Sequence, residues 1–129
     1  MDSKTAQKIK SKNTKIEQTL GKAMWASGLR YRKHCKDVQG KPDFCFRNKK
    51  IAIFCDSEFW HGKKYLEGEA FKRNSDFWIA KIKRNIERDE KVNIVLRQEG
   101  WTVLRFWGKD IETKLDECVN TVVLKVQEK

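Results

Sequence analysis

An apolar run at residues 51–55 (IAIFC) constrains the fold more than any other part of this sequence. A short, continuous apolar run with β-branched and aromatic side chains is typical of a buried strand. Residues 43–46 (DFCF) read as a second strand, and the polar residues 47–50 (RNKK) separate the two. The sequence therefore predicts a hairpin in which the strand 43–46 is followed by a tight turn and a returning strand 51–56.

Two acids mark the ends of this hairpin. Asp43 begins the first strand and Asp56 ends the second, so the pairing brings them to one edge of the sheet. Carboxylate oxygens at such an edge suit Mg²⁺, although two solvated acids at strand ends are the commoner outcome for isolated aspartates. His61 follows beside Gly62, and a neutral imidazole near a metal-bound phosphate can deprotonate water. His34 stands alone in a basic stretch, and we expect it at the surface.

Helical patterns surround the hairpin. Thr14 and Glu17 occupy the N-cap and capping-box positions of a first helix that stops near Gly28, and residues 30–41 are expected to be irregular. Apolar spacing predicts further elements in the order helix, strand, helix, at residues 75–99, 101–107 and 111–126. The predicted fold is α/β: one domain over residues 14–129 with a central mixed sheet flanked by helices, preceded by a flexible basic arm at residues 1–13.

The charge balance points to a polyanionic partner. The 129 residues hold 29 Lys and Arg against 18 Asp and Glu, for a formal net charge of +11, which favours double-stranded DNA. No apolar run approaches a membrane-spanning length, and the first residues do not resemble a secretory signal, so we expect a cytoplasmic protein that binds no membrane. Four cysteines, at positions 35, 45, 55 and 118, are then expected to be reduced.

Several segments, in order, resemble the very-short-patch-repair (Vsr) DNA mismatch endonuclease family of the restriction-endonuclease-like superfamily. They are residues 40–44 (GKPDF), 53–62 (IFCDSEFWHG), 76–82 (DFWIAKI) with 85–89 (NIERD), and 100–107 (GWTVLRFW). The resemblance covers roughly residues 6–127, and an ordered set is far more specific than any single motif.

The resemblance implies a Mg²⁺-dependent catalytic site. Asp43 matches the family's metal ligand, and the backbone carbonyl of Cys55 matches a second contact, so the thiol need not coordinate. His61 matches the general base. Glu17 matches an acid of the same site, although capping alone explains it. Asp56 either adds a ligand or orients His61.

The resemblance also assigns DNA contacts. An aromatic wedge enters the duplex beside a T·G mismatch and unstacks a base step. A helical pair one turn apart touches the mismatched bases, although an ordinary solvated helix face is the plainer reading of that pair. Apart from the resemblance, we expect two further lysines, together with those of residues 1–13, to bind phosphates non-specifically. The residues of the aromatic wedge are Phe59, Trp60 and Trp78, although Trp78 could instead pack in the core. The helical pair that touches the mismatched bases is Lys81 and Asn85. The two lysines that bind phosphates are Lys63 and Lys64.

The sequence departs from the family where the best-known members hold a structural zinc. The corresponding positions are Glu58, Lys63, Tyr65 and Lys109, which do not rebuild that site, so we expect no zinc. The resemblance thus implies a Mg²⁺-dependent endonuclease that nicks one DNA strand at or near a T·G mismatch, and we expect it to act as a monomer. Mismatch-repair proteins or a DNA cytosine methylase are further partners it allows. The alternatives are another restriction-like or mobile-element nuclease and a catalytically silent DNA-binding module.

Overall fold

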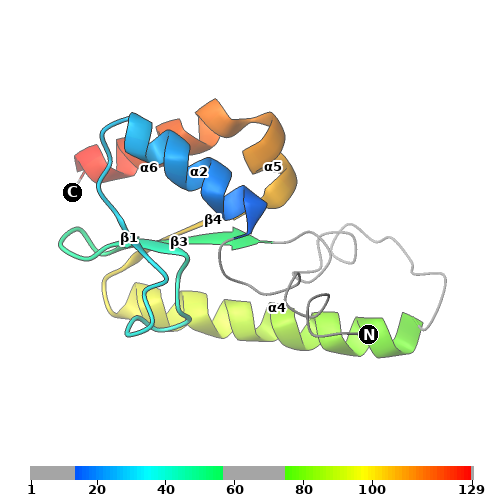
Figure 1. Ribbon diagram of the computed structural model, residues 1–129. Helices are drawn as coiled ribbons and strands as arrows, with labels where there is room; N and C mark the ends of the chain where they lie inside the picture. The colour runs from blue at the N-terminus through cyan, green and yellow to red at the C-terminus, as the bar shows by residue number, and fades with distance from the viewer. Residues whose placement is uncertain (1–13, 57–74, 129) are drawn as a thin grey trace.

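A four-stranded sheet lies between two helical layers in the computed structural model, which describes residues 14–56 and 75–128, with side chains from residue 79 onward in the second part (Figure 1). Helices α2 (Lys15–Ala26), α5 (Gly108–Thr113) and α6 (Leu115–Glu128) cover one face of the sheet. The long helix α4 (Ser75–Gln98) covers the other. The predicted α/β domain with a mixed sheet is confirmed, and the architecture is consistent with a restriction-endonuclease-like fold.

The strands follow one another across the sheet in chain order. They are β1 (Arg32–Lys33), β2 (Phe44–Phe46), β3 (Ile51–Asp56) and β4 (Thr102–Trp107). The first three pair antiparallel, which confirms the predicted hairpin, whereas β3 and β4 are parallel. Parallel neighbours need a long crossover connection, and α4 supplies it. The apolar strand β3 therefore lies inside the sheet, between β2 and β4.

The alternation of side chains along β3 divides the core in two. Ile51 and Ile53 face α2, α5 and α6, where they pack with residues such as Leu20. Ala52 and Phe54 face α4. A strand that contributes buried side chains to both layers has no polar face, which explains the unbroken apolar run in the sequence.

The start of α2 follows the predicted N-cap. The Thr14 hydroxyl oxygen accepts a hydrogen bond from the Glu17 backbone N–H at 3.4 Å. The helix ends at Ala26, two residues before Gly28, whose φ of +90° is in the left-handed region. The cap places Glu17 in the first turn of α2.

Three sequence expectations are wrong. Residues 30–41 include the short strand β1, which lacks an apolar signal because Arg32 and Lys33 are both exposed. The last helix is two helices, since the chain breaks at Lys114 between α5 and α6. Cys35 and Cys45 form a disulfide rather than remaining reduced, because the turn between β1 and β2 brings their Cα atoms within 6.5 Å.

Other expectations fall outside the described residues, including the flexible arm at residues 1–13. Within the described part of the chain, every helix is too short or too polar to cross a membrane.

Gly40 allows a close approach between the turn before β2 and α4. Its φ is +80°, and a Cβ atom added there would overlap the Val92 side chain. We expect Gly40→Ala to lower the free energy of unfolding in urea by about 1–3 kcal/mol through overpacking, in addition to about 1–2 kcal/mol for left-handed backbone.

Gly28→Ala is the matched control, because Gly28 has a similar φ of +90° but no atom within 4 Å of the added Cβ. It should show only the backbone effect. Equal losses of stability in the two variants would contradict the overlap with Val92.

Candidate active site

Asp43 lies at the start of the hairpin and is fixed by the central strand. Its Oδ2 accepts a hydrogen bond from the Cys55 backbone N–H at 2.7 Å. The donor belongs to the backbone of β3, so the sheet itself holds the carboxyl group in place. This hydrogen bond becomes charge-assisted, and therefore stronger, when Asp43 is ionised.

Glu17 is the second acid at this position. It is 4% exposed and comes from the first turn of α2, where the helix meets the end of the sheet. Burial, a hydrogen bond with Glu17 and the negative charges of Glu17 and Asp56 raise the pKa of Asp43 to about 8, although the Cys55 N–H opposes this rise. Two carboxyl groups therefore share a poorly solvated place and resist being ionised together.

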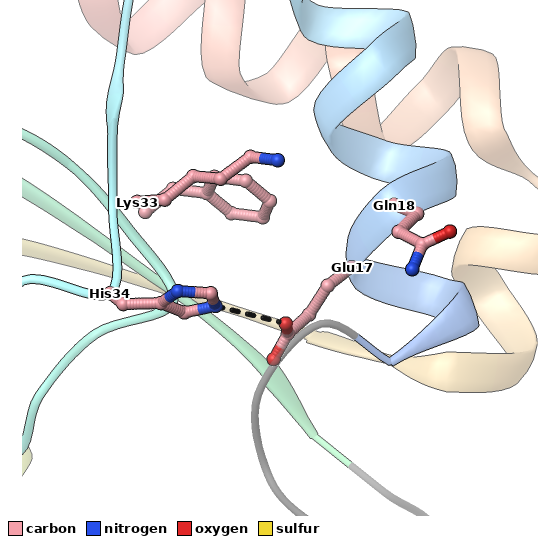
Figure 2. Close-up of a pocket in the computed structure, with 5 residues that line it drawn as sticks. Glu17, Gln18, Lys33 and His34 are labelled. Carbon is pink, nitrogen blue, oxygen red and sulfur yellow. Dashed lines mark hydrogen bonds and ion pairs between the residues drawn. The ribbon is translucent and has the colours of Figure 1, made fainter.

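His34 reaches the same place from β1, contrary to its expected surface position. Its Nε2 lies 3.4 Å from Glu17 Oε2, in a hydrogen bond that becomes an ion pair when the imidazole is protonated. Figure 2 shows His34 pointing toward Glu17 across a small pocket that Gln18, Lys33 and Phe44 also line. Sequence reasoning missed His34 because β1, which aligns it with Asp43, has no apolar signal. The one available signal was the GKPDF segment that follows.

Asp56 is buried near this pair of acids, and its side chain also pairs with an arginine. Its Oδ1 forms an ion pair with Arg105 Nη1 at 3.0 Å, and Arg105 lies over the Phe54 ring on the side of the sheet that α4 covers. The register of β2 and β3 continues to Asp43 opposite Phe54, so Asp43 and Asp56 lie near the same edge of the sheet, and the negative charge of Asp56 contributes to the raised pKa of Asp43. A role for Asp56 in metal binding or in orienting His61 stays a prediction.

Cys55 contributes its backbone to the site. Burial, followed by the charges of Asp43, Glu17 and Asp56, raises the pKa of its thiol far above the ordinary value. The thiol therefore stays protonated near neutral pH, and a protonated thiol is a poor metal ligand. The backbone carbonyl is the group of Cys55 that suits a hard cation.

The oxygen atoms at this site suit a magnesium ion that keeps several of its waters, rather than a metal held entirely by protein side chains. Among residues 14–56 and 75–128, no three His, Cys, Asp or Glu side chains are grouped as a metal site. Mg²⁺ keeps several waters and is commonly held by one or two carboxylates. Asp43, Glu17 and the Cys55 carbonyl offer oxygen donors of the required kind.

Most of the predicted DNA contacts cannot be placed. Lys81 and Asn85 are half-buried and lie one turn apart on α4, as predicted. Trp78 lies in the first turn of α4, before the described side chains begin. The predicted base His61 and the predicted contacts Phe59, Trp60, Lys63 and Lys64 lie outside the described residues. The roles of all these residues stay predictions.

Comparison with known proteins identifies the family. Residues 1–67 match the family model for the DNA mismatch endonuclease Vsr. The type II nicking enzyme V.NmeDIP of Neisseria meningitidis serogroup C is 51% identical over 127 residues, which covers 98% of this chain and 86% of that protein. The chain belongs to the Vsr family.

Two further relatives span a wide range of identity. The type II nicking enzyme V.HpaIIP of Haemophilus parainfluenzae is 52% identical over 103 residues, covering 79% of this chain and 73% of that enzyme. The DNA mismatch endonuclease Vsr of Escherichia coli (strain K12) is 31% identical over 105 residues, covering 81% and 67%. As a Vsr-family member, the chain is an endodeoxyribonuclease that acts on DNA. Restriction-endonuclease-like nucleases generally use a divalent metal.

The raised pKa of Asp43 makes the stability of the metal-free protein depend on pH. The folded protein binds this proton up to about pH 8, whereas the unfolded chain releases it near the ordinary value of 3.8. Between these values the folded state holds more protons, so stability falls as pH rises. We expect the melting temperature in EDTA to decrease from pH 5 to pH 8, and Asp43→Asn to flatten this decrease.

Asp116→Asn removes a negative charge from an exposed position on α6 and controls for net charge. Asp43→Asn should separate from this control most clearly at pH 8. The assignment is wrong if the wild type and Asp43→Asn lose stability with pH in parallel.

Proposed function

We propose that this protein is a Mg²⁺-dependent endonuclease that nicks one strand of DNA at or near a T·G mismatch. The observation that carries the proposal is the closeness of two carboxyl groups, those of buried Glu17 and half-buried Asp43, near the C-terminal end of β3. Poorly solvated acids of this kind are costly for folding, and strongly perturbed acids cluster at functional sites.

The residues divide the chemistry among them. Asp43 and the Cys55 carbonyl would hold Mg²⁺, which when bound stabilises negative charge on the scissile phosphate and the leaving oxygen. Glu17 orients the attacking water, and His61 accepts its proton. Attack in line with the leaving oxygen breaks one phosphodiester bond and leaves the other strand intact.

The names of the relatives support a nicking activity at mismatched DNA. The Neisseria and Haemophilus relatives are type II nicking enzymes, and the Escherichia coli relative is a DNA mismatch endonuclease. The net charge of +11 supports binding to the phosphate backbone. For the mismatch itself we propose Phe59, Trp60 and Trp78 as an aromatic wedge, with Lys81 and Asn85 at the bases.

The activity is tested with duplexes of one sequence that carry T·G, T·A or C·G at the central pair, labelled separately on each strand. We expect Mg²⁺-dependent nicking of one strand of the T·G duplex. Asp43→Asn should reduce its rate by at least about 100-fold while DNA binding survives, because the phosphate contacts lie elsewhere.

Two results would count against the proposed activity. If Asp43→Asn nicked DNA at the wild-type rate, Asp43 could not be the metal ligand that we propose. Equal nicking of the T·G and matched duplexes would leave a nuclease without mismatch preference.

Trp60 tests the origin of the preference. A mismatch lowers the free energy needed to open a base step, so a wedge gains most where pairing is already poor. We expect Trp60→Ala to keep a nearly normal melting temperature while the advantage of the T·G duplex over the matched duplex disappears.

A core position for Trp60 predicts the reverse result. Truncating a large core side chain typically costs about 3–5 kcal/mol of stability. A strong loss of thermal stability with the T·G preference intact would therefore place Trp60 in the core.

A further inference from the structure

We propose that His34 is a positioning residue that holds the Glu17 carboxyl group beside Asp43. The inference deepens the proposed function and rests on it, because it gives His34 a part in the metal-dependent site. Four features of the described residues support it: the backbone pairing of His34, its contact with Glu17, its conformation and the disulfide that follows it.

The backbone places His34 directly across from Asp43. In the ladder between β1 and β2, Lys33 is paired with Phe44, so the next residues in register are His34 and Asp43. The His34 N–H donates a hydrogen bond to the Asp43 carbonyl oxygen at 2.9 Å. One end of this short ladder thus carries both the metal ligand and the histidine.

The side chain of His34 then reaches α2. The imidazole Nε2 is 3.4 Å from Glu17 Oε2, and the two side chains are 23% and 5% exposed. Glu17 also shares a hydrogen bond with Asp43, so its carboxyl group contacts both residues. A hydrogen-bond donor from His34 stabilises negative charge on Glu17 and so opposes the repulsion that would turn its carboxyl group away from Asp43.

The conformation of His34 is unusual for a residue with a side chain. Its φ is +48°, in the left-handed region that non-glycine residues seldom occupy. Such conformations are retained where the surrounding structure enforces them, and they cluster at functional sites. Here the turn directs the imidazole toward Glu17, as Figure 2 shows.

The disulfide braces the same arrangement. Cys35 directly follows His34, and Cys45 lies two residues after Asp43. The Cys35 N–H also donates to the Pro42 carbonyl oxygen at 3.1 Å. A covalent link at this point fixes the register of His34 against Asp43, which a two-residue strand could hold only weakly.

The test uses His34→Asn and His34→Gln in the full chain. Asparagine tolerates left-handed backbone well, so it keeps the turn, but its side chain is too short to reach Glu17. Glutamine returns an N–H donor at nearly the reach of the imidazole. Lys50→Asn is the control, because Lys50 also has a left-handed φ of +53° but lies in the turn at the other end of β3.

Two measurements separate positioning from folding. Mn²⁺ binding is followed without DNA by the EPR signal of the free ion, and nicking of the T·G duplex is followed at varied Mg²⁺. We expect His34→Asn to weaken Mn²⁺ binding and to reduce kcat by about 10–100-fold, with KM for DNA and the melting temperature nearly unchanged. His34→Gln should recover part of both losses, and Lys50→Asn should resemble the wild type.

The double variant of His34→Asn and Glu17→Gln tests whether His34 acts through Glu17. If His34 acts through Glu17, His34→Asn should add little to the loss caused by Glu17→Gln. The proposal is overturned by wild-type Mn²⁺ binding and kcat in His34→Asn, by a full additional loss in the double variant, or by a drop in melting temperature that glutamine does not reverse.

The variant Asp43→Asn, measured in the same experiments, distinguishes a failure of the proposed metal-dependent function from a failure of the proposed role of His34. If it keeps nicking, the proposed metal-dependent function fails. If it abolishes nicking while His34→Asn remains at the wild-type level, only the role of His34 fails.

Discussion

Two carboxyl groups that share one poorly solvated place are the constraint around which this protein is arranged. Glu17 comes from α2 and Asp43 directly precedes β2, and the backbone of β3 donates the hydrogen bond that holds Asp43. No single element makes the pair. The N-cap at Thr14 sets the first turn of α2, and the hairpin register sets Asp43, so the site exists only when the helix has docked on the sheet.

On the opposite face of the sheet, the positively charged side chain of Arg105 connects the strands to α4. Arg105 on β4 donates to Asp56 at 3.0 Å and to Asn93 on α4 at 2.8 Å, and its guanidinium lies 4.1 Å from the centre of the Phe54 ring. A half-buried guanidinium with several partners fixes geometry as well as charge. It ties α4 to the C-terminal ends of both parallel strands. The helix proposed to contact bases is thereby fixed relative to the strand that carries the carboxylate site.

Sequence reasoning found the parts of the fold that apolar patterns specify. The run at residues 51–55 predicts β3 because a strand buried on both faces cannot carry polar residues, and Thr14 predicts the helix start because its hydroxyl replaces a missing backbone partner. The pairing of Asp43 with Glu17 was accessible only through the family resemblance, since nothing local relates a helix cap to a strand twenty-six residues away.

His34 and the disulfide escaped prediction for one shared reason. Both depend on β1, whose two residues are exposed and basic, so pairing with β2 rather than burial determines their conformation. The ion pair of Asp56 with Arg105 was also missed, because Arg105 comes from β4 and the pairing within the hairpin says nothing about that strand.

The electrostatics of the site couple its stability to its ligand. Without a cation, the raised pKa of Asp43 keeps a proton on the carboxyl pair near neutral pH, and that proton reduces the repulsion between Asp43 and Glu17. A divalent cation bound by the same oxygens must displace the proton, so its affinity rises with pH. The fold tolerates two acids in one place because a proton removes part of their charge, and the proposed cation would do the same. The same acids that destabilise the protein when both are ionised are the ones that we propose as ligands of a hard cation.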